Sequence, residues 1–255
     1  MKILLAATEQ GGLGKSKGSA KAPEEIVKII NCQFEKIEIV EANLEETNNN
    51  IYKKVLEQDK ALIIGGDHSI TFPAFKAFIK NNPGAGLIIF DAHPDCVNNF
   101  QPPTHEDFVR VLIEEKILSP YKIILVGLRQ FDPIELKFLK DNKIRYFSMK
   151  QIFDYGIKDV CETVMESALA WPGVYLSIDI DVVDPAFAPG TGYREPGGLN
   201  SAEFLNFIKR IKKLKNLKMV DIVEISPERD RDELTVRLGA KIIQELNSNA
   251  SLEKK

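Results

Sequence analysis

Three side chains able to bind a metal ion stand at alternate positions directly after an apolar run. The run is residues 86–90, and the motif that follows it contains Asp91, His93 and Asp95. Because a β-strand points alternate side chains to one face, this spacing predicts that the three side chains meet at a common point. Carboxylate and imidazole groups gathered at a strand end are typical of a metal site. The alternative is a surface Asp/His turn after a buried strand.

Two further apolar runs end in the same kinds of residue. Residues 174–178 lead into Asp179 and Asp181, again two positions apart, and residues 61–64 lead into a motif that contains His68. The chain has three histidines, and all of them lie between positions 68 and 105. Structural histidines scattered through a fold would not cluster in this way.

The chemistry of this residue set indicates a pair of divalent ions. Oxygen-rich ligands with a minority of imidazole suit Mn²⁺ and similar ions, whereas a structural zinc site prefers cysteines. Four aspartates carry a formal charge that two divalent cations cancel, and without metal they would repel one another. A two-metal site can lower the pKa of a bridging water and present hydroxide to an electrophilic carbon. The expected ligands are His68, Asp91, His93, Asp95, Asp179 and Asp181.

Strand-like runs alternate with helical patterns along the chain. This alternation predicts a mainly parallel sheet covered by helices on both faces. In such sheets the binding crevice lies at the carboxyl ends of the strands, so the metal ligands and Glu224 are expected to converge there. No repeat or shift in composition divides the chain, and residues 1–255 are expected to form one domain. The eight expected strands are residues 3–7, 36–40, 61–64, 86–90, 122–127, 144–147, 174–178 and 218–224.

Helix starts are recognisable between several of these strands. Asp132 followed by Pro133 and Glu135 forms a capping pattern, and a second one opens at Asn200. The last helix is expected from about Asp232 through Leu246, with a polar, frayed tail over residues 247–255. The glycine-rich segment 11–18 lacks the spacing of a phosphate-binding loop and is interpreted as a flexible loop that leads into a helix opened by Pro23.

The composition of the chain limits the kinds of partner that it is expected to bind. The 34 basic and 37 acidic residues create no overall field that would attract nucleic acid or an anionic membrane. No apolar run approaches the length of a membrane span or a secretory signal. The three cysteines are odd in number and far apart, which indicates neither a disulfide framework nor a zinc knuckle, and Cys96 beside the metal motif is a possible ligand or a small apolar filler. We therefore expect a cytoplasmic protein that binds neither nucleic acid nor a membrane.

Several short motifs together resemble the ureohydrolases, the arginase and agmatinase family. They occur in consistent order over about residues 60–245, with a looser fit at the N-terminus. The motifs are residues 65–69 (GGDHS), 91–95 (DAHPD), 127–129 (GLR), 144–149 (IRYFSM), 177–185 (SIDIDVVDP), 189–192 (PGTG), 197–199 (GGL) and 223–225 (VEI).

The resemblance implies a three-layer α/β/α sandwich with an eight-stranded parallel sheet and two Mn²⁺ ions per chain. One ion would take His68, Asp91, Asp95 and Asp179, and the other His93, Asp91, Asp179 and Asp181, so that Asp91 and Asp179 bridge. A metal-bridging hydroxide would attack the guanidinium carbon of agmatine, arginine or a similar compound and release urea and an amine. The family also implies a homo-oligomer, a trimer or a hexamer.

Family roles carry over to three further residues. Glu224 matches the glutamate that pairs with the guanidinium, and His105 matches the histidine that shuttles protons; with the metal ligand Asp95 they are the expected catalytic residues. Asp132 matches the residue that reads a substrate amino group. The plain alternatives are a strand-end carboxylate for Glu224, a capping or exposed side chain for His105, and the helix cap for Asp132.

The departures from the family pattern concern the substrate. Glu106 stands where glycine is common, and Tyr193, Arg194 and Glu195 replace the usual threonine-proline segment. Arg194 is able to meet a substrate carboxylate, while Glu106 and Glu195 are able to meet an amine. A formiminoglutamase-type amidine hydrolase therefore remains an alternative, as do a non-catalytic metal-binding relative and, more distantly, a deacetylase-like enzyme.

Overall fold

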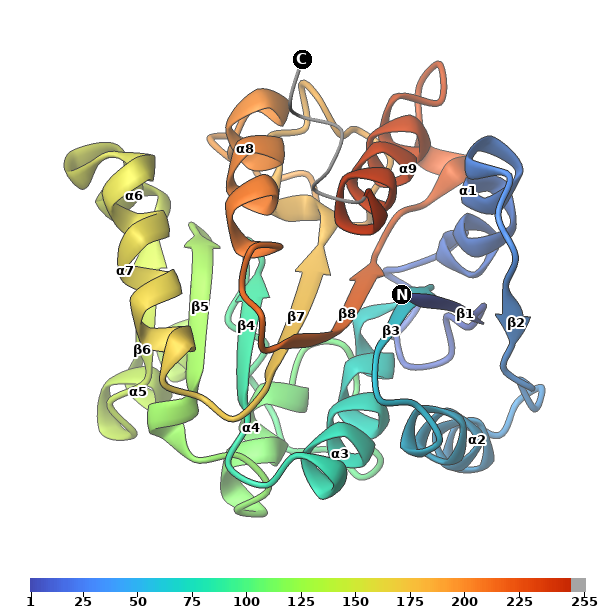
Figure 1. The fold of residues 1–255 in the computed structure, drawn as a ribbon, viewed down its shortest axis with the longest axis horizontal. Helices are drawn as coiled ribbons and strands as arrows, with labels where there is room; N and C mark the ends of the chain where they lie inside the picture. Colours follow the sequence, from blue (N-terminus) through green and yellow to red (C-terminus); the bar gives the residue numbers. More distant parts are fainter. Residues whose placement is uncertain (249–255) are drawn as a thin grey trace.

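Eight parallel strands form a single sheet in the computed structural model, which describes residues 1–248 (Figure 1). The spatial order of the strands is β2-β1-β3-β8-β7-β4-β5-β6. The expected fold class is thereby confirmed. The strands are β1 (Lys2–Ala6), β2 (Glu35–Lys36), β3 (Ala61–Gly65), β4 (Gly86–Phe90), β5 (Ile123–Leu128), β6 (Arg145–Ser148), β7 (Val174–Asp179) and β8 (Leu217–Val223).

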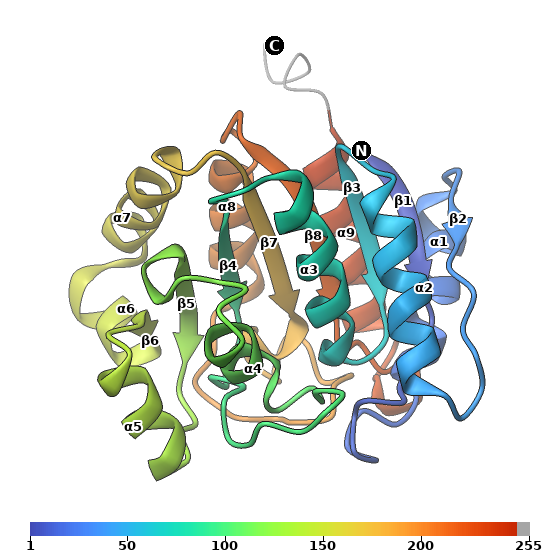
Figure 2. The ribbon, with the colours of Figure 1, turned by 90° about the horizontal axis from the view of Figure 1, so that it is seen from below.

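The central strands are apolar because helices cover the sheet on both faces. Every residue of β3, β4, β5 and β7 is buried, as expected for a parallel sheet without a solvated face. Figure 2 shows the two helix layers, with α2, α3 and α4 on one face and α8 and α9 on the other. The helices are α1 (Ala22–Ile30), α2 (Leu44–Leu56), α3 (Thr71–Asn81), α4 (Phe108–Glu114), α5 (Pro133–Asp141), α6 (Met149–Tyr155), α7 (Ile157–Leu169), α8 (Ser201–Ile211) and α9 (Leu234–Asn247).

The edge strand β2 is shorter than the sequence predicts. It pairs with β1 only over Glu35–Lys36, although the amide of Ile37 still donates to Leu5. Beyond that point the backbone of Val40 is bound by side chains instead, because its N–H donates to Thr47 Oγ1 and its carbonyl accepts from Gln10 Nε2. Residues 38–40 therefore leave the sheet edge.

The predicted capping signals mark helix starts. Asp132 opens α5 and Asn200 opens α8, each with a complete capping box. The last helix begins at Leu234, two residues after the expected start, because Asp232 and Glu233 have left-handed backbone conformations. Of the expected frayed tail, residues 249–255 lie outside the described residues. No helix in the described part of the chain is long and apolar enough to cross a lipid bilayer.

The strand order places four candidate segments side by side. Strands β3, β8, β7 and β4 are consecutive neighbours in the centre of the sheet, and the segments that carry the expected site residues follow them directly. These segments meet at the carboxyl edge, where the backbone is tightly packed. A Cβ added at Gly66 would stand 1.8 Å from the carbonyl oxygen of Thr8, so only glycine fits there.

Candidate metal centre

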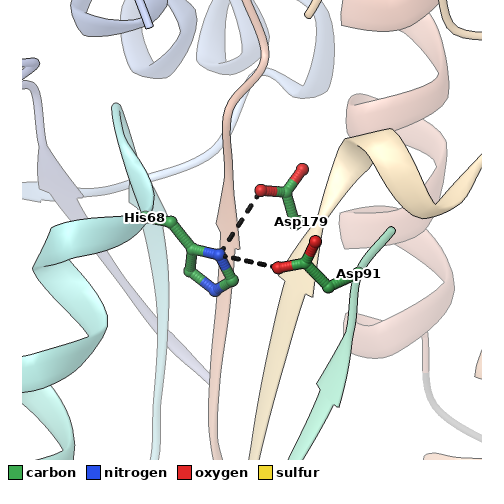
Figure 3. Close-up of side chains that lie close together, drawn as sticks. All are labelled: His68, Asp91 and Asp179. Carbon is green, nitrogen blue, oxygen red and sulfur yellow. Dashed lines mark ion pairs between the residues drawn. The ribbon is translucent and has the colours of Figure 1, made fainter. Parts of the chain in front are cut away.

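The imidazole of His68 faces three carboxylates at the carboxyl edge of the sheet. Its Nδ1 atom lies 3.1 Å from Asp91 Oδ2, 3.0 Å from Asp95 Oδ2 and 3.4 Å from Asp179 Oδ2. Figure 3 shows this nitrogen pointing between Asp91 and Asp179, which come from the ends of β4 and β7. His68 and Asp91 are each only 1% exposed. Three strand ends thus bring one imidazole and three carboxylates to one point.

A second group adjoins the first and shares Asp91 with it. His93 Nδ1 lies 3.0 Å from Asp181 Oδ2 and 3.5 Å from Asp91 Oδ1. Asp91 therefore presents one carboxylate oxygen to each histidine, the geometry of a bridging ligand. Asp179 faces His68 with Oδ2, and its Oδ1 accepts the backbone N–H of Asp181 at 2.8 Å, as Asp91 Oδ1 accepts that of His93 at 2.6 Å. The six expected ligands are all brought together.

Turns, rather than a continuing strand, aim these side chains. Strand β4 ends at Phe90, and Asp95 has a left-handed backbone with φ of 53°. Asp181 lies in the short 3₁₀ helix η4 (Ile180–Val182), and His68 opens η2 (His68–Ile70). The structure brings together the residues that the alternate spacing singles out, although β4 ends at Phe90 and turns set the directions of these side chains.

The residues present fit a pair of divalent cations. His68 Nδ1 and Asp91 Oδ2 are buried without a hydrogen-bond partner although they face each other, and a shared cation between them would satisfy both atoms. Burial and the neighbouring Asp91 charge raise the pKa of Asp95, and burial and the Asp181 charge raise that of Asp179. Two cations would remove this repulsion, and the carboxylate and imidazole atoms of the two groups are ligands that divalent cations accept.

A buried hydrogen-bond network orients His68 from behind. Ser177 Oγ lies 2.9 Å from His68 Nε2 and donates to Asp221 Oδ1 at 2.6 Å. Asp221 is completely buried and also accepts from Tyr175 at 2.6 Å and Thr71 at 2.8 Å. When Nε2 carries the ring proton and donates it to Ser177, the Nδ1 lone pair is directed at the carboxylates, as ligation requires.

Glu224 and His105 form a second polar pair next to the metal ligands. Glu224 directly follows β8, with a left-handed φ of 62°, and its Oε1 accepts from Ser16 Oγ at 2.8 Å and from the backbone N–H of His68 at 2.9 Å. His105 Nδ1 lies 3.2 Å from the same oxygen. Burial lowers the pKa of His105, but the Glu224 carboxylate more than compensates and raises it to about 9. His105 is therefore charged at neutral pH.

A cavity of about 600 Å³ opens above these groups. Its floor contains metal ligands and Glu224, and its walls include carboxylates, aromatic side chains and His105. Among the lining residues in the described chain there is neither lysine nor arginine. The lining residues are His93, Asp95, Val97, His105, Glu106, Gln130, Phe131, Asp132, Pro133, Glu135, Asp179, Asp181, Thr191, Tyr193, Glu195 and Glu224.

Comparison with known proteins assigns the chain to a family. The arginase family model matches residues 6–248, nearly the whole chain. The chain belongs to the arginase family. The predicted family membership is thus confirmed, and arginase-family proteins are hydrolases of C–N bonds in amidines that depend on a binuclear metal centre.

Similar proteins within the arginase family differ in their named substrates. An arginase of Staphylococcus aureus is 29% identical over 246 residues, which cover 89% of this chain and 81% of the relative. A guanidinopropionase of Pseudomonas aeruginosa is 35% identical over 190 residues, 72% of this chain and 59% of the relative. The crystal structure of a formimidoylglutamase from Bacillus subtilis shares the fold, with a TM-score of 0.89 and 22% sequence identity. The match covers 96% of this chain and 85% of the formimidoylglutamase chain.

Not all of the residues expected to contact the substrate lie at the cavity. Asp132 lines the cavity, but its Oδ1 accepts the N–H of Ile134 as the helix cap. The guanidinium of Arg194 donates to the carbonyl of Arg229 and does not line the cavity. Cys96 is buried and its N–H donates to Glu135, so it packs beside the site without joining either ligand group.

Sequence reasoning missed Ser16 and the network behind His68. Ser16 lies in the segment interpreted as a flexible loop, yet it is 1% exposed and bonded to Glu224. No spacing rule links positions so far apart. Asp221 and Ser177 carry a usable signal, because each is a polar residue between two apolar residues of a buried strand.

Proposed function

We propose that this protein hydrolyses a small guanidino compound to urea and an amine at a pair of Mn²⁺ ions, and that agmatine is a better substrate than arginine. The observation that carries the proposal is the pair of adjoining ligand groups that share Asp91 beneath a cavity containing Glu224. The proposed ligands are the six residues expected from the sequence. When bound, the two ions supply Lewis-acid activation of water at this edge of the sheet.

Glu224 is suited to holding the guanidinium. Its Oε1 is used by Ser16, His68 and His105, while no hydrogen bond from the described residues reaches Oε2. A guanidinium carries N–H donors that pair well with a carboxylate. One oxygen thus fixes the side chain and the other remains for the substrate, which holds the electrophilic carbon near the metal ligands.

His105 is suited to protonating the leaving amine. The Glu224 carboxylate keeps it charged at neutral pH, and its Nε2 is buried without a hydrogen-bond partner while the ring lines the cavity. A proton held at Nε2 is therefore available to a leaving nitrogen in the cavity.

The charge of the cavity supports a cationic substrate. The charged His105 in the lining is paired with Glu224, and no lysine or arginine of the lining is available to neutralise a substrate carboxylate. Burying an uncompensated charge is strongly unfavourable. Arginine, guanidinobutyrate and guanidinopropionate carry such a carboxylate, whereas agmatine has an ammonium at that end.

A substrate panel tests the proposal. Urea release by the Mn²⁺-loaded protein is measured with agmatine, arginine, 4-guanidinobutyrate and 3-guanidinopropionate, and formamide release with formiminoglutamate. We expect urea from agmatine with the largest kcat/KM of the panel. Formamide from formiminoglutamate alone would establish the alternative amidine hydrolase, and no turnover with two bound metals would indicate a non-catalytic relative.

We further infer a homo-oligomer, a trimer or a hexamer, located in the cytoplasm. The free thiols of Cys32, Cys96 and Cys161 suit a reducing compartment, and family resemblance supports assembly. Light scattering coupled to size-exclusion chromatography measures the mass of the assembly; a monomer would contradict this inference.

A further inference from the structure

Glu106 and Tyr193 form a hydrogen-bonded pair in the wall of the cavity. The Tyr193 hydroxyl donates to Glu106 Oε1 at 2.6 Å, and both residues line the cavity. The Glu106 side chain is 30% exposed, compared with 4% for His105 next to it. Glu106 Oε1 also lies 3.7 Å from His105 Nε2, so the partly exposed carboxylate stands between the proposed proton donor and solvent.

The loop that carries Glu106 is fixed by its own hydrogen bonds. Asp107 is completely buried, and its two carboxylate oxygens accept the backbone N–H groups of Thr104 at 2.5 Å and Phe100 at 2.6 Å. The backbone carbonyl of Glu106 accepts from Val97 at 3.1 Å. A side chain on such a loop needs little ordering when a ligand binds, which favours its use in recognition.

Tyr193 connects this carboxylate to the reacting end of the cavity. Its ring lies 5.0 Å from that of His93 and 6.1 Å from that of His105, nearly parallel to the latter. The phenol therefore forms one wall between the metal ligands and Glu106. A substrate whose guanidinium pairs with Glu224 passes along an aromatic wall that ends in a negative charge.

Glu106 has a carboxylate oxygen left for a ligand. Tyr193 uses Oε1, and no hydrogen bond from the described residues reaches Oε2. Other carboxylates in the wall are more fully engaged, because Glu135 accepts the N–H groups of Cys96 and Asp132. The carboxylate of Glu195 also lines the cavity, but no described hydrogen bond holds it in place.

We propose that Glu106, oriented by Tyr193, binds the distal ammonium of the substrate and is the residue that makes this site prefer a guanidine with a positively charged tail. This inference rests on the proposed function and names the part of the site that selects the substrate.

Three substrates of similar length, whose tails end in groups of different charge, provide the test. Agmatine has a cationic end, pentylguanidine has the same length with a neutral end, and 4-guanidinobutyrate has an anionic end. In Glu106→Gln we expect KM for agmatine to rise about tenfold, since a charge-assisted hydrogen bond is lost, while kcat changes less than about twofold. Both constants for pentylguanidine should stay as in the wild type.

Further variants separate recognition from general damage. Tyr193→Phe keeps the ring and removes the hydroxyl, so it should raise KM for agmatine by a smaller factor and leave pentylguanidine unaffected. Glu106→Lys should raise kcat/KM for 4-guanidinobutyrate above the wild-type value. Glu166→Gln, an exposed carboxylate on α7, is the matched control and should change nothing.

Distinct outcomes overturn the inference and the proposed function. If wild-type protein releases urea from agmatine and Glu106→Gln leaves its KM unchanged, or if Glu195→Gln raises KM more, Glu106 is not the recognition residue. If Glu106→Gln lowers kcat equally for agmatine and pentylguanidine, it acts through His105 instead. If the wild type releases urea from no guanidine, the proposed function fails; calorimetric binding of agmatine and pentylguanidine to both proteins then still decides the role of Glu106.

Discussion

Ser16 and His105 reach the same carboxylate oxygen of Glu224 from distant parts of the chain. Ser16 comes from the N-terminal segment, 208 positions before Glu224. With the N–H of His68, it makes Oε1 the centre of a small network inside the cavity wall. Each donor restricts the rotation of the carboxylate, so the network sets the direction in which Oε2 points.

Removing the Ser16 hydroxyl should impair catalysis more than folding. Ser16→Ala leaves Glu224 with two donors, and we expect kcat/KM for agmatine to fall about tenfold, the value of one hydrogen bond to a charged group. The control is Ser19→Ala on the same segment, where the hydroxyl is buried without a partner. Urea-release kinetics of both variants check this; equal effects would show that Ser16 has no specific role.

The His105–Glu224 pair should make stability depend on pH. The pKa of His105 is raised to about 9 in the folded protein, above the value of about 6.5 in the unfolded chain. The pair thus contributes stability that is fully present below about pH 6.5 and lost as the pH rises through 9, at most about 3 kcal/mol.

Urea unfolding of metal-free wild type and His105→Gln at pH 6 and pH 9.5 measures this contribution. The wild type should exceed the variant by more at pH 6 than at pH 9.5. A difference that is constant, or that grows with pH, would contradict the assignment of a charged His105 paired with Glu224.

Strands β7 and β8 orient the metal ligand His68 as well as supporting the sheet. Tyr175 and Ser177 on β7 both donate to Asp221 on β8, but only Ser177 also contacts His68. Two neighbouring hydroxyls therefore share an acceptor and differ in their connection to the metal site.

This difference gives a matched pair of variants. Ser177→Ala should lower Mn²⁺ affinity about 10- to 100-fold, because His68 loses the group that fixes its ring orientation. Tyr175→Phe should reduce the free energy of unfolding by about 1 kcal/mol while metal affinity stays near the wild-type value. Competition with a metal chelator measures the affinities; similar losses in both variants would refute the orienting role of Ser177.

Elements with a strong local signal were predicted from the sequence, and features that depend on long-range packing were not. The buried runs of β3, β4 and β7 and the capping box at Asp132 are local, and their positions agree with the structure. No single segment of the sequence determines the order of the strands in the sheet. The short β2 is explained by Thr47, whose side chain takes the backbone of Val40 away from the sheet edge.

The candidate site was predictable to the extent that its residues follow apolar runs. The six expected ligands, Glu224 and His105 all lie where parallel strands end or in the adjoining loop, and the structure brings them together. The charge of Arg194 alone suggests a contact with a substrate carboxylate. Its guanidinium donates instead to the carbonyl of Arg229. Ser16 had no chemical signature in its surroundings, because its role comes only from tertiary packing.

At the scale of the whole molecule, the sheet concentrates negative charge at one edge. Four neighbouring central strands deliver carboxylates to the same place, and burial makes their mutual repulsion unfavourable. The net charge of the chain is only −3, so this field is local. Cations bound at this edge would neutralise the carboxylates, so the proposed hydrolysis is expected to depend on metal.

The most direct test is to titrate Mn²⁺ into metal-free protein and to record urea release from agmatine at each step. We expect no activity without metal and a rate that rises to a plateau at two ions per chain, with Asp179→Asn failing to reach this plateau although the variant remains folded. Full activity in the absence of metal, or two bound ions without urea from any guanidine, would contradict the proposed metal-dependent hydrolysis.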